Sequence, residues 1–139
     1  MEPLKQCAAL PVIEVNGELQ VLLITTRGRG SWTIPKGWPK RKLPDPDLAA
    51  KEAFEEAGVA GKISRQPVGS YLYTKRLHWF SWVRCRVTVY ALYVDRQFLD
   101  WPERSSRKAL WMDRKEAAGL VRDKNLAALL RRPLDIRAR

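Results

Sequence analysis

The sequence predicts an α/β fold in which one mixed β-sheet is covered by helices on both faces. Three observations support this class. Apolar runs of strand length occupy the start and the middle of the chain, one long helical segment lies between them, and two more helical segments close the chain. The 139 residues are in the usual size range of one domain, so we expect a single domain over residues 1–139.

The first strands are predicted to form a hairpin. Residues 6–15 are mostly apolar and end at Asn16-Gly17, a dipeptide that favours a tight turn between antiparallel strands. Residues 20–26 form a second apolar run, which completes the hairpin. A basic loop with two glycines follows at residues 27–30, and residues 32–36 are predicted to be a short extended segment.

The long helix is predicted over residues 46–57. Asp45 is suited to the N-cap, Pro46 to the first helical position and Gly58 to the stop just past the end. Small alanines flank Phe54 on one face of this helix, so we expect that face to lie close against the sheet.

The next segments are predicted to be extended at residues 61–65 and 68–76. A long strand follows over residues 82–95, where apolar and polar side chains alternate, which indicates a strand with two different faces. His78, the single histidine, falls between two strands, and we interpret it as a turn residue rather than as a catalytic acid or base.

The C-terminal segments are predicted to be helices over residues 113–121 and 123–132. Asp113 is suited to cap the first of them, and Pro133 ends the second. The tail over residues 135–139 is expected to be loose.

The composition is that of a globular protein, with 45% apolar and 29% charged residues. No segment is long and apolar enough to span a membrane, and the N-terminus does not resemble a secretory signal. Cys7 and Cys85 are too few for a disulfide framework, so we expect two buried free thiols in a reducing cytoplasm. The sequence therefore predicts a cytoplasmic protein without a membrane partner.

The chain is strongly basic, with 26 Lys and Arg against 15 Asp and Glu and a formal net charge of +11. Such a charge attracts anionic ligands, and the attraction weakens with salt. The charge alone therefore indicates an anionic ligand without identifying it. Nucleic acid is the competing partner, and a basic surface that only keeps the protein in solution is the third interpretation.

Three carboxylates mark the long helix as a candidate metal site. Glu52, Glu55 and Glu56 are at positions i, i+3 and i+4, which share one face of a helix. Like charges this close favour a cation between them, and Mg²⁺ prefers oxygen ligands. Mn²⁺ is the expected substitute. The alternative is an ordinary amphipathic helix with a solvated acidic face.

The residues around these carboxylates resemble the Nudix box, the loop–helix–loop signature of Nudix hydrolases. The positions that agree with it are Gly37, Glu52, Glu55, Glu56, Gly58 and Val59. The sequence departs from the box at three positions: Leu43 replaces a glutamate, Lys51 replaces an arginine, and Ala53 is smaller than the usual aliphatic residue. The resemblance implies a Nudix-type α/β/α sandwich, a mixed β-sheet with the box helix and the C-terminal helices packed on its faces.

The resemblance also implies roles for these residues. Glu52 and Glu56 would be metal ligands, Glu55 would be a ligand or would orient the attacking water, and the backbone carbonyl of Lys36 would be a further ligand. Gly37, Lys51 and Gly58 would be structural, with Lys51 holding a glutamate in place. The identity of the general base stays open among the three glutamates and a residue from a distant loop. Glu103 and Asp100 are candidates for an outlying carboxylate that binds metal or acts as the base.

The chain is most similar to the diphosphoinositol polyphosphate phosphohydrolases, which also act on diadenosine polyphosphates. This implies Mg²⁺-dependent cleavage of a phosphoanhydride bond in a highly anionic substrate, and homodimers are common in the family. The candidate substrate-binding residues are basic: Arg27, Arg29, Lys36, Lys42, Arg84 and Arg86. The alternative is a catalytically weak module that binds RNA or another polyanion, with Trp38, Trp79 and Trp82 available for base stacking.

Overall fold

The structure is a computed structural model that describes residues 2–136. These residues form an eight-stranded sheet with three α-helices and one 3₁₀ turn, Arg104–Ser106. The strands are β1 (Leu4–Val15), β2 (Glu18–Thr25), β3 (Trp32–Thr33), β4 (Lys36–Gly37), β5 (Val59–Ile63), β6 (Gly69–His78), β7 (Ser81–Gln97) and β8 (Ala109–Asp113). The helices are α1 (Asp45–Ala57), α2 (Arg114–Leu120) and α3 (Lys124–Arg131).

The sheet is mixed, as predicted. Its main order is β3-β2-β1-β7-β5, with β4 paired to β1, β6 to β7 and β8 to β2. β1 and β7 run parallel, while their other pairings are antiparallel. β7 spans 17 residues and pairs with β6 through its first half and with β5 through its second half. β6 and β5 therefore follow one another along one edge of β7, while β1 lies along its other edge.

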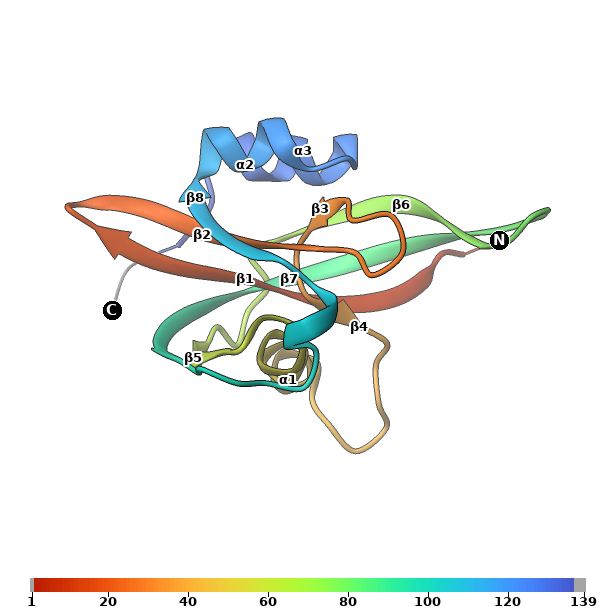
Figure 1. The fold of residues 1–139 in the computed structure, drawn as a ribbon. Coiled ribbons are helices and arrows are strands. Elements are labelled where there is room, and N and C mark those ends of the chain that lie inside the picture. The colour runs from red at the N-terminus through yellow and green to blue at the C-terminus, as the bar shows by residue number, and fades with distance from the viewer. Residues whose placement is uncertain (1, 137–139) are drawn as a thin grey trace.

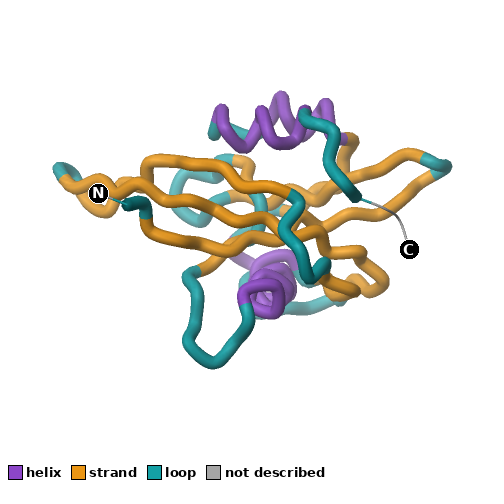
Figure 2. The backbone as a smooth tube through the Cα atoms, turned by 180° about the vertical axis from the view of Figure 1, so that it is seen from behind, coloured by secondary structure: helices purple, strands orange, loops and turns teal. Residues whose placement is uncertain are grey.

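Helices cover both faces of the sheet, as the fold class predicts. α1 lies alone on one face, and α2 and α3 lie together on the other (Figure 1). The view from behind shows the same three layers (Figure 2). The β6–β7 hairpin and the β1–β2 hairpin extend past the helices at opposite ends of the sheet.

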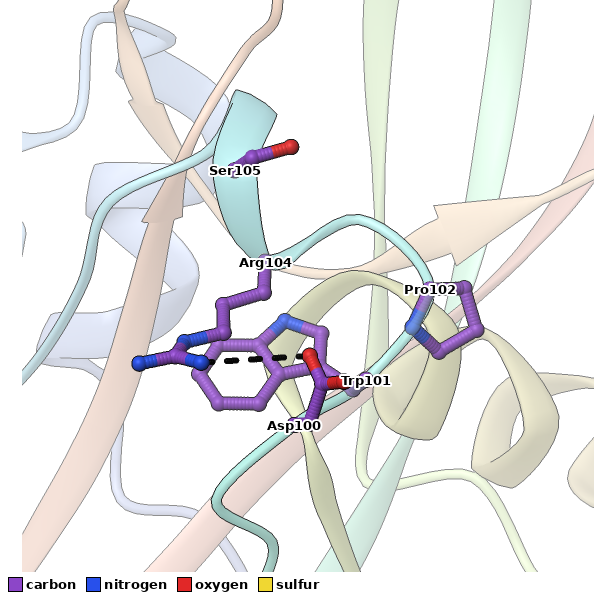
Figure 3. A pocket seen from close by; sticks show the side chains of 5 residues that line it. All are labelled: Asp100, Trp101, Pro102, Arg104 and Ser105. Carbon is purple, nitrogen blue, oxygen red and sulfur yellow. Dashed lines mark ion pairs between the residues drawn. The ribbon is translucent and has the colours of Figure 1, made fainter.

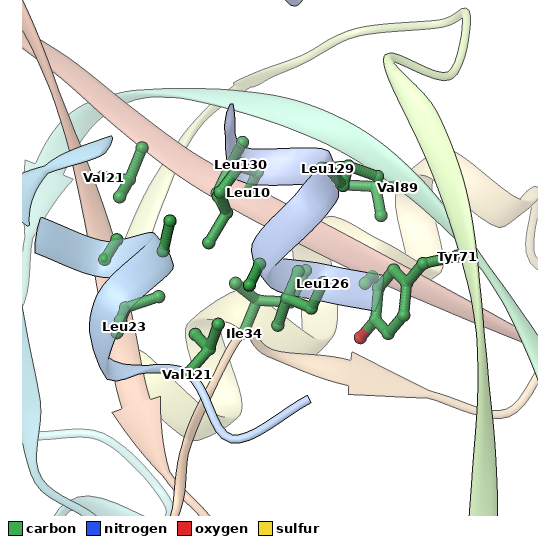
Figure 4. Close-up of a cluster of buried hydrophobic side chains, with 14 of the residues drawn as sticks. Leu10, Val21, Leu23, Ile34, Tyr71, Val89, Val121, Leu126, Leu129 and Leu130 are labelled. Carbon is green, nitrogen blue, oxygen red and sulfur yellow. The ribbon is translucent and has the colours of Figure 1, made fainter. Parts of the chain in front are cut away.

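Each face of the sheet has its own hydrophobic core. On the α1 face, helix residues such as Leu48 and Ala53 pack against Leu92. On the other face, Leu126 and Leu129 of α3 pack against strand residues (Figure 4). Since β1 contributes alternate residues to the two cores, both faces of this central strand are buried.

The start of α1 differs from the sequence prediction. The N-cap is Pro44, which provides no side-chain cap, and Asp45 is already the first helical residue. Proline at the N-cap leaves the first amides without a side-chain partner. The acidic side chains of Asp45 and Asp47 in the first turn stabilise this end of the helix instead, because they interact favourably with the helix dipole. The end agrees with the prediction, because Gly58 adopts a left-handed conformation with φ 69°.

The C-terminal helices begin at capping aspartates. Asp113 accepts a hydrogen bond from the amide of Glu116, as predicted, and Asp123 caps α3 in the same way. Strand β8 was not predicted. The end of the described chain is also better packed than expected, because Leu134 and Ile136 contact the core beneath α3. The remaining tail residues, 137–139, lie outside the described part.

Cys7 and Cys85 are free and buried, as predicted. Burial raises the pKa of the Cys7 thiol to about 12. Within residues 2–136, none of the helices has the length and apolar character needed to cross a bilayer.

Candidate functional site

A polar cleft of about 410 Å³ lies where β4 meets α1. It is bounded by the box helix on one side and by the segment before β8 on the other. Its walls are formed mainly by charged and polar side chains: Gln6, Thr26, Arg27, Thr33, Lys36, Gly37, Trp38, Lys40, Glu52, Glu56, Lys75, Glu103 and Arg107. The cleft therefore combines three carboxylates with five cationic side chains.

Two glutamates of α1 face this cleft because of their helical spacing. Glu52 and Glu56 are separated by about 40° around a helix of 3.6 residues per turn. Glu52 lies directly against Gly37, where an added Cβ would stand only 2.6 Å from its Cδ atom. A glycine at position 37 is therefore needed for the Glu52 carboxylate to occupy its place.

The Glu56 carboxylate is buried, with 6% of the residue exposed. Burial raises its pKa to about 7, against the opposing effect of the nearby Arg107 guanidinium. Glu52 and Glu103 raise the Glu56 pKa further because they add negative charge. Burial likewise raises the pKa of Glu52. The cleft thus holds negative charge that a bound cation would stabilise.

Arg107 connects the two sides of the cleft. Its guanidinium lies 2.8 Å from Oε1 of Glu103 and 3.7 Å from Oε1 of Glu56. It also donates a hydrogen bond of 3.1 Å to the carbonyl of Thr25 at the end of β2. Since the Arg107 side chain is 13% exposed, this network fixes Glu103 and Arg107 in the cleft wall.

The segment that carries Glu103 is fastened to the end of α1. The amide of Glu103 donates to the carbonyl of Glu55, and the amide of Phe98 donates to the carbonyl of Gly58. Trp101 lies against Gly58, where a Cβ would collide with its ring. Figure 3 shows this segment from close by, with Arg104 beside the Trp101 ring and its ion pair with Asp100, at 3.9 Å, as a dashed line.

Lys36 projects into the cleft from β4. Its ammonium group lies 5.3 Å from the centre of the Tyr73 ring, and burial lowers its pKa, which the Glu56 carboxylate opposes. Tyr73 is itself fixed by a hydrogen bond of 2.6 Å to Gln6. Lys36 is therefore a half-buried cation held over an aromatic ring, in position to contact an anion in the cleft.

The structure does not bring Glu55 into the cleft. Its side chain lies on the flank of α1, where Nζ of Lys51 is 2.5 Å from Oε1 of Glu55. Lys51 thus holds a glutamate, but the glutamate it holds does not line the cleft with Glu52 and Glu56. Helical geometry explains this difference. Viewed down the helix, position i+3 lies about 60° to one side of position i, and position i+4 lies about 40° to the other side.

The predicted substrate-binding residues are divided among three places. Arg27 and Lys36 line the cleft, and Arg27 lies 3.7 Å from Glu103. Arg29 lines a neighbouring groove together with Trp32 and Arg122. Lys42 lies in the exposed turn before α1, while Lys40 of the same turn reaches the cleft.

Arg84 and Arg86 do not line the cleft. They are exposed on β7, paired in register with Thr74 and Leu72 of β6, in the part of the hairpin that extends past α1. Asp100 is also outside the cleft, with 87% of its side chain exposed.

The donor set suits a hard divalent cation, although the side chains do not form a closed cage. Within residues 2–136, no group of three His, Cys, Asp or Glu side chains is arranged to hold a metal ion by itself. Glu52 and Glu56 are available, while Arg107 holds Glu103. Mg²⁺ is commonly bound by one or two carboxylates together with substrate phosphates, so a two-carboxylate cleft with cationic walls fits that ion.

Sequence reasoning missed Arg107 and named Glu103 only as a candidate carboxylate from a distant loop. The two residues are at positions i and i+4 with a favourable order of charge, which is a local signal for an ion pair. Nothing in their local sequence indicates that they reach α1, which is more than 45 residues earlier in the chain. Gln6 and Lys75 were missed for the same reason.

Comparison with known proteins adds sequence relatives to this geometry. The chain is 33% identical over 102 residues to "Nudix hydrolase 16, mitochondrial" of Arabidopsis thaliana, with 71% of this chain and 56% of the relative covered. It is 31% identical over 119 residues to "Diphosphoinositol polyphosphate phosphohydrolase 2" of Rattus norvegicus, with 84% and 62% covered. The chain thus spans a little over half the length of these curated relatives. No family model matches the chain.

Solved structures share the fold. A crystal structure of C. elegans Ap4A hydrolase covers 94% of this chain and 95% of its own, with a TM-score of 0.66 and 18% identity. A binary complex of a C. elegans Ap4A hydrolase gives a TM-score of 0.68 at 16% identity, covering 92% of this chain and 93% of its own. At these identities the likeness concerns the fold alone.

Proposed function

Because this chain belongs to the Nudix hydrolase family, we propose that it is a metal-dependent pyrophosphohydrolase that cleaves a phosphoanhydride bond in a highly anionic substrate. The observation that supports this most directly is the cleft in which Glu52 and Glu56 face Lys36, Arg27 and Arg107. Phosphoryl transfer requires carboxylates that bind the metal ion and basic side chains that bind the substrate phosphates.

In this proposal Glu52 and Glu56 would hold Mg²⁺ or Mn²⁺, and the carbonyl of Lys36 would be a further donor. The ion would neutralise the charge that develops on the phosphate oxygens during displacement. Gly37 keeps space for Glu52, and Lys51 fixes Glu55 on the flank of the helix.

The basic side chains bind and orient the polyphosphate. Lys36 of β4 and Arg27 of the loop after β2 line the cleft, and Arg107 is anchored between Glu56 and Glu103. Glu103 is our candidate for the proton acceptor. As water attacks phosphorus, a new P–O bond forms, the bridging P–O bond breaks, and the proton of the water passes to the Glu103 carboxylate.

The substrate class follows from charge and from the relatives. The net charge of +11 and the cationic cleft favour a substrate with several phosphates. Relatives are described as a diphosphoinositol polyphosphate phosphohydrolase and as an Ap4A hydrolase. We therefore propose an inositol pyrophosphate or a dinucleoside polyphosphate. The free thiols suit a reducing compartment such as the cytoplasm.

A panel assay tests the proposal. Phosphate and nucleotide release is measured from dinucleoside polyphosphates, nucleotide sugars and inositol pyrophosphates, with Mg²⁺ and then with EDTA. We expect turnover of at least one polyphosphate, loss of that turnover on chelation, and a decrease of about a hundredfold or more in kcat for Glu56→Gln. The exposed Glu14→Gln is the matched control and should behave as wild type.

A non-catalytic module is the second candidate, because Leu43 and Lys51 depart from the box. No turnover of any panel member, together with tight binding of single-stranded RNA, would replace the enzyme by this module. Turnover that persists in EDTA would exclude the metal-dependent reaction. Restoring the carboxylate with Leu43→Glu then reports whether its absence limits the rate.

A further inference from the structure

The β6–β7 hairpin ends in an exposed apolar tip. Trp79 and Phe80 form its two-residue turn and are 78% and 91% exposed. Leu77, at an irregularity in the strand pairing, is 51% exposed. The hairpin extends beyond the helices, so this tip is at one end of the molecule (Figure 1). Two-residue turns favour small residues such as Asn and Gly, so the turn itself does not require Trp and Phe.

Cationic side chains are placed behind the tip. Arg76 is paired with Trp82, two pairs back from the turn, and Arg84 is paired with Thr74 further along. Arg86 lies beside Lys5 of β1, so a third strand adds its charge. Between Glu56 and Asp95 the sequence has no acidic residue, so the paired part of the hairpin, residues 69–89, carries positive charge only.

We propose that this tip docks the protein on the surface of an anionic lipid bilayer. Trp79, Phe80 and Leu77 enter the boundary between headgroups and acyl chains, and the arginines contact lipid phosphates. At about 3.3 Å per residue, Arg76 lies about 7 Å and Arg84 about 13 Å behind the turn. Interfacial apolar side chains are buried about 5–10 Å, so these long side chains reach the phosphate layer.

The arrangement favours a bilayer over a nucleic acid strand. Bases stack on aromatic rings that follow a groove one after another, with cations beside the backbone. Here the two most exposed rings are adjacent residues at the end of a ribbon. The ring of Trp82, on its flank, is 58% exposed but has the Arg76 guanidinium 5.5 Å from its centre, against one ring face. A second copy of the chain is less suited, because three tip side chains are far short of the ~800 Å² that each partner buries in a stable interface.

This partner differs from the sequence expectation. Hydropathy detects segments of about 20 apolar residues that span a membrane. A turn of two apolar residues gives no such signal, and its position at the end of an extended hairpin is visible only in the fold.

Vesicle sedimentation with the full chain tests the proposal. We expect binding to vesicles of equal parts phosphatidylcholine and phosphatidylglycerol, and much weaker binding to phosphatidylcholine alone. The double change Trp79→Ser with Phe80→Ser should lower the vesicle affinity by about tenfold or more. Arg84→Gln with Arg86→Gln should also lower it and flatten its salt dependence. Leu99→Ser, an equally exposed apolar residue outside the hairpin, is the control.

Three results would contradict lipid docking by the tip. Vesicle binding that is unchanged in the tip variant overturns the proposal, as does tip-dependent binding of RNA or tip-dependent dimerisation without vesicle binding. Hydrolysis is assayed on the same samples. Since Trp79 and Phe80 lie outside the cleft, the tip variant should keep wild-type turnover, so failure of lipid docking and failure of the hydrolase proposal are separable.

Discussion

Among single residues, the spacing of the glutamates on α1 correctly indicated a carboxylate site but did not identify which of the three glutamates line the cleft. Sequence reasoning placed Glu52, Glu55 and Glu56 on one face. In the structure only the i, i+4 pair faces the cleft, because Glu55 is drawn to Lys51 on the flank. The face of a helix is broad, and which side chains of that face meet a cleft depends on neighbours that a local pattern does not include.

Gly37 is the residue whose substitution best tests the cleft. Gly37→Ala places a methyl group against the Glu52 carboxylate, which must move away. We expect kcat on the substrate identified in the panel to fall about ten- to hundredfold, because small misplacements of catalytic groups have effects of that size. The far end of Glu52 is flexible, so circular dichroism and the melting temperature should change little.

Gly119→Ala is the matched control for this experiment. It lies in α2, where an added Cβ meets no atom within 4 Å, and alanine is the better helix former. Activity and stability should be retained. A Gly37→Ala protein with wild-type kcat would show that the position of Glu52 does not limit the reaction.

The buried Glu56 predicts a pH-dependent stability for the metal-free protein. Its pKa is raised from the ordinary value of 4.5 to about 7, so between these values the folded state binds more protons than the unfolded state. Stability due to Glu56 is therefore present at low pH and decreases as pH rises through this window. The full shift corresponds to roughly 3 kcal/mol.

Urea unfolding in EDTA at pH 5 and pH 8 measures this effect. Glu56→Gln does not ionise, so wild type should become less stable relative to this variant as pH rises. Glu14→Gln, at an exposed position, controls for the loss of a carboxylate. Parallel pH profiles for wild type and Glu56→Gln would contradict the raised pKa.

At the scale of elements, strong local patterns predicted the structure well, and weak ones did not. The alternation in residues 82–95 identified β7, and Asp113 was correctly predicted as a cap. β8 was missed because its five residues have a sheet partner, β2, that lies some 85 residues away along the chain. The Asp45 cap was wrong because Pro44 precedes it and the helix begins one residue early.

The cap of α3 gives a prediction at this scale. Asp123 accepts hydrogen bonds of 2.9 Å from the amides of Asn125 and Leu126. Asp123→Ala should lower the free energy of unfolding by about 1 kcal/mol and the melting temperature by about 3–5 °C. Differential scanning calorimetry measures both.

Asp100→Ala is the control for the cap, since Asp100 is exposed and lies in an irregular segment. If both variants melted at the same temperature, the two hydrogen bonds at the start of α3 would not contribute measurably to stability.

At the scale of the whole molecule, the fold class was predictable and the assembly of the site was predictable only in part. The hairpin, the long helix and the C-terminal helices are sufficient to indicate a layered sheet. Glu52, Glu56 and Gly37 came from one local motif. Glu103 and Arg107 join them because hydrogen bonds from residues 98 and 103 fasten their segment to the end of α1. Such closure over long sequence separations is a property of packing, which no local pattern encodes.

The positions of the two cysteines give the chain a pair of native reporters. Cys7 faces the core under α1, and Cys85 points toward the opposite layer on the neighbouring strand. Since both thiols are buried, a small alkylating reagent can modify either one only when its own layer opens. Mass spectrometry of timed samples would measure the alkylation rate of each thiol and show which side of the sandwich opens more often, without any introduced label.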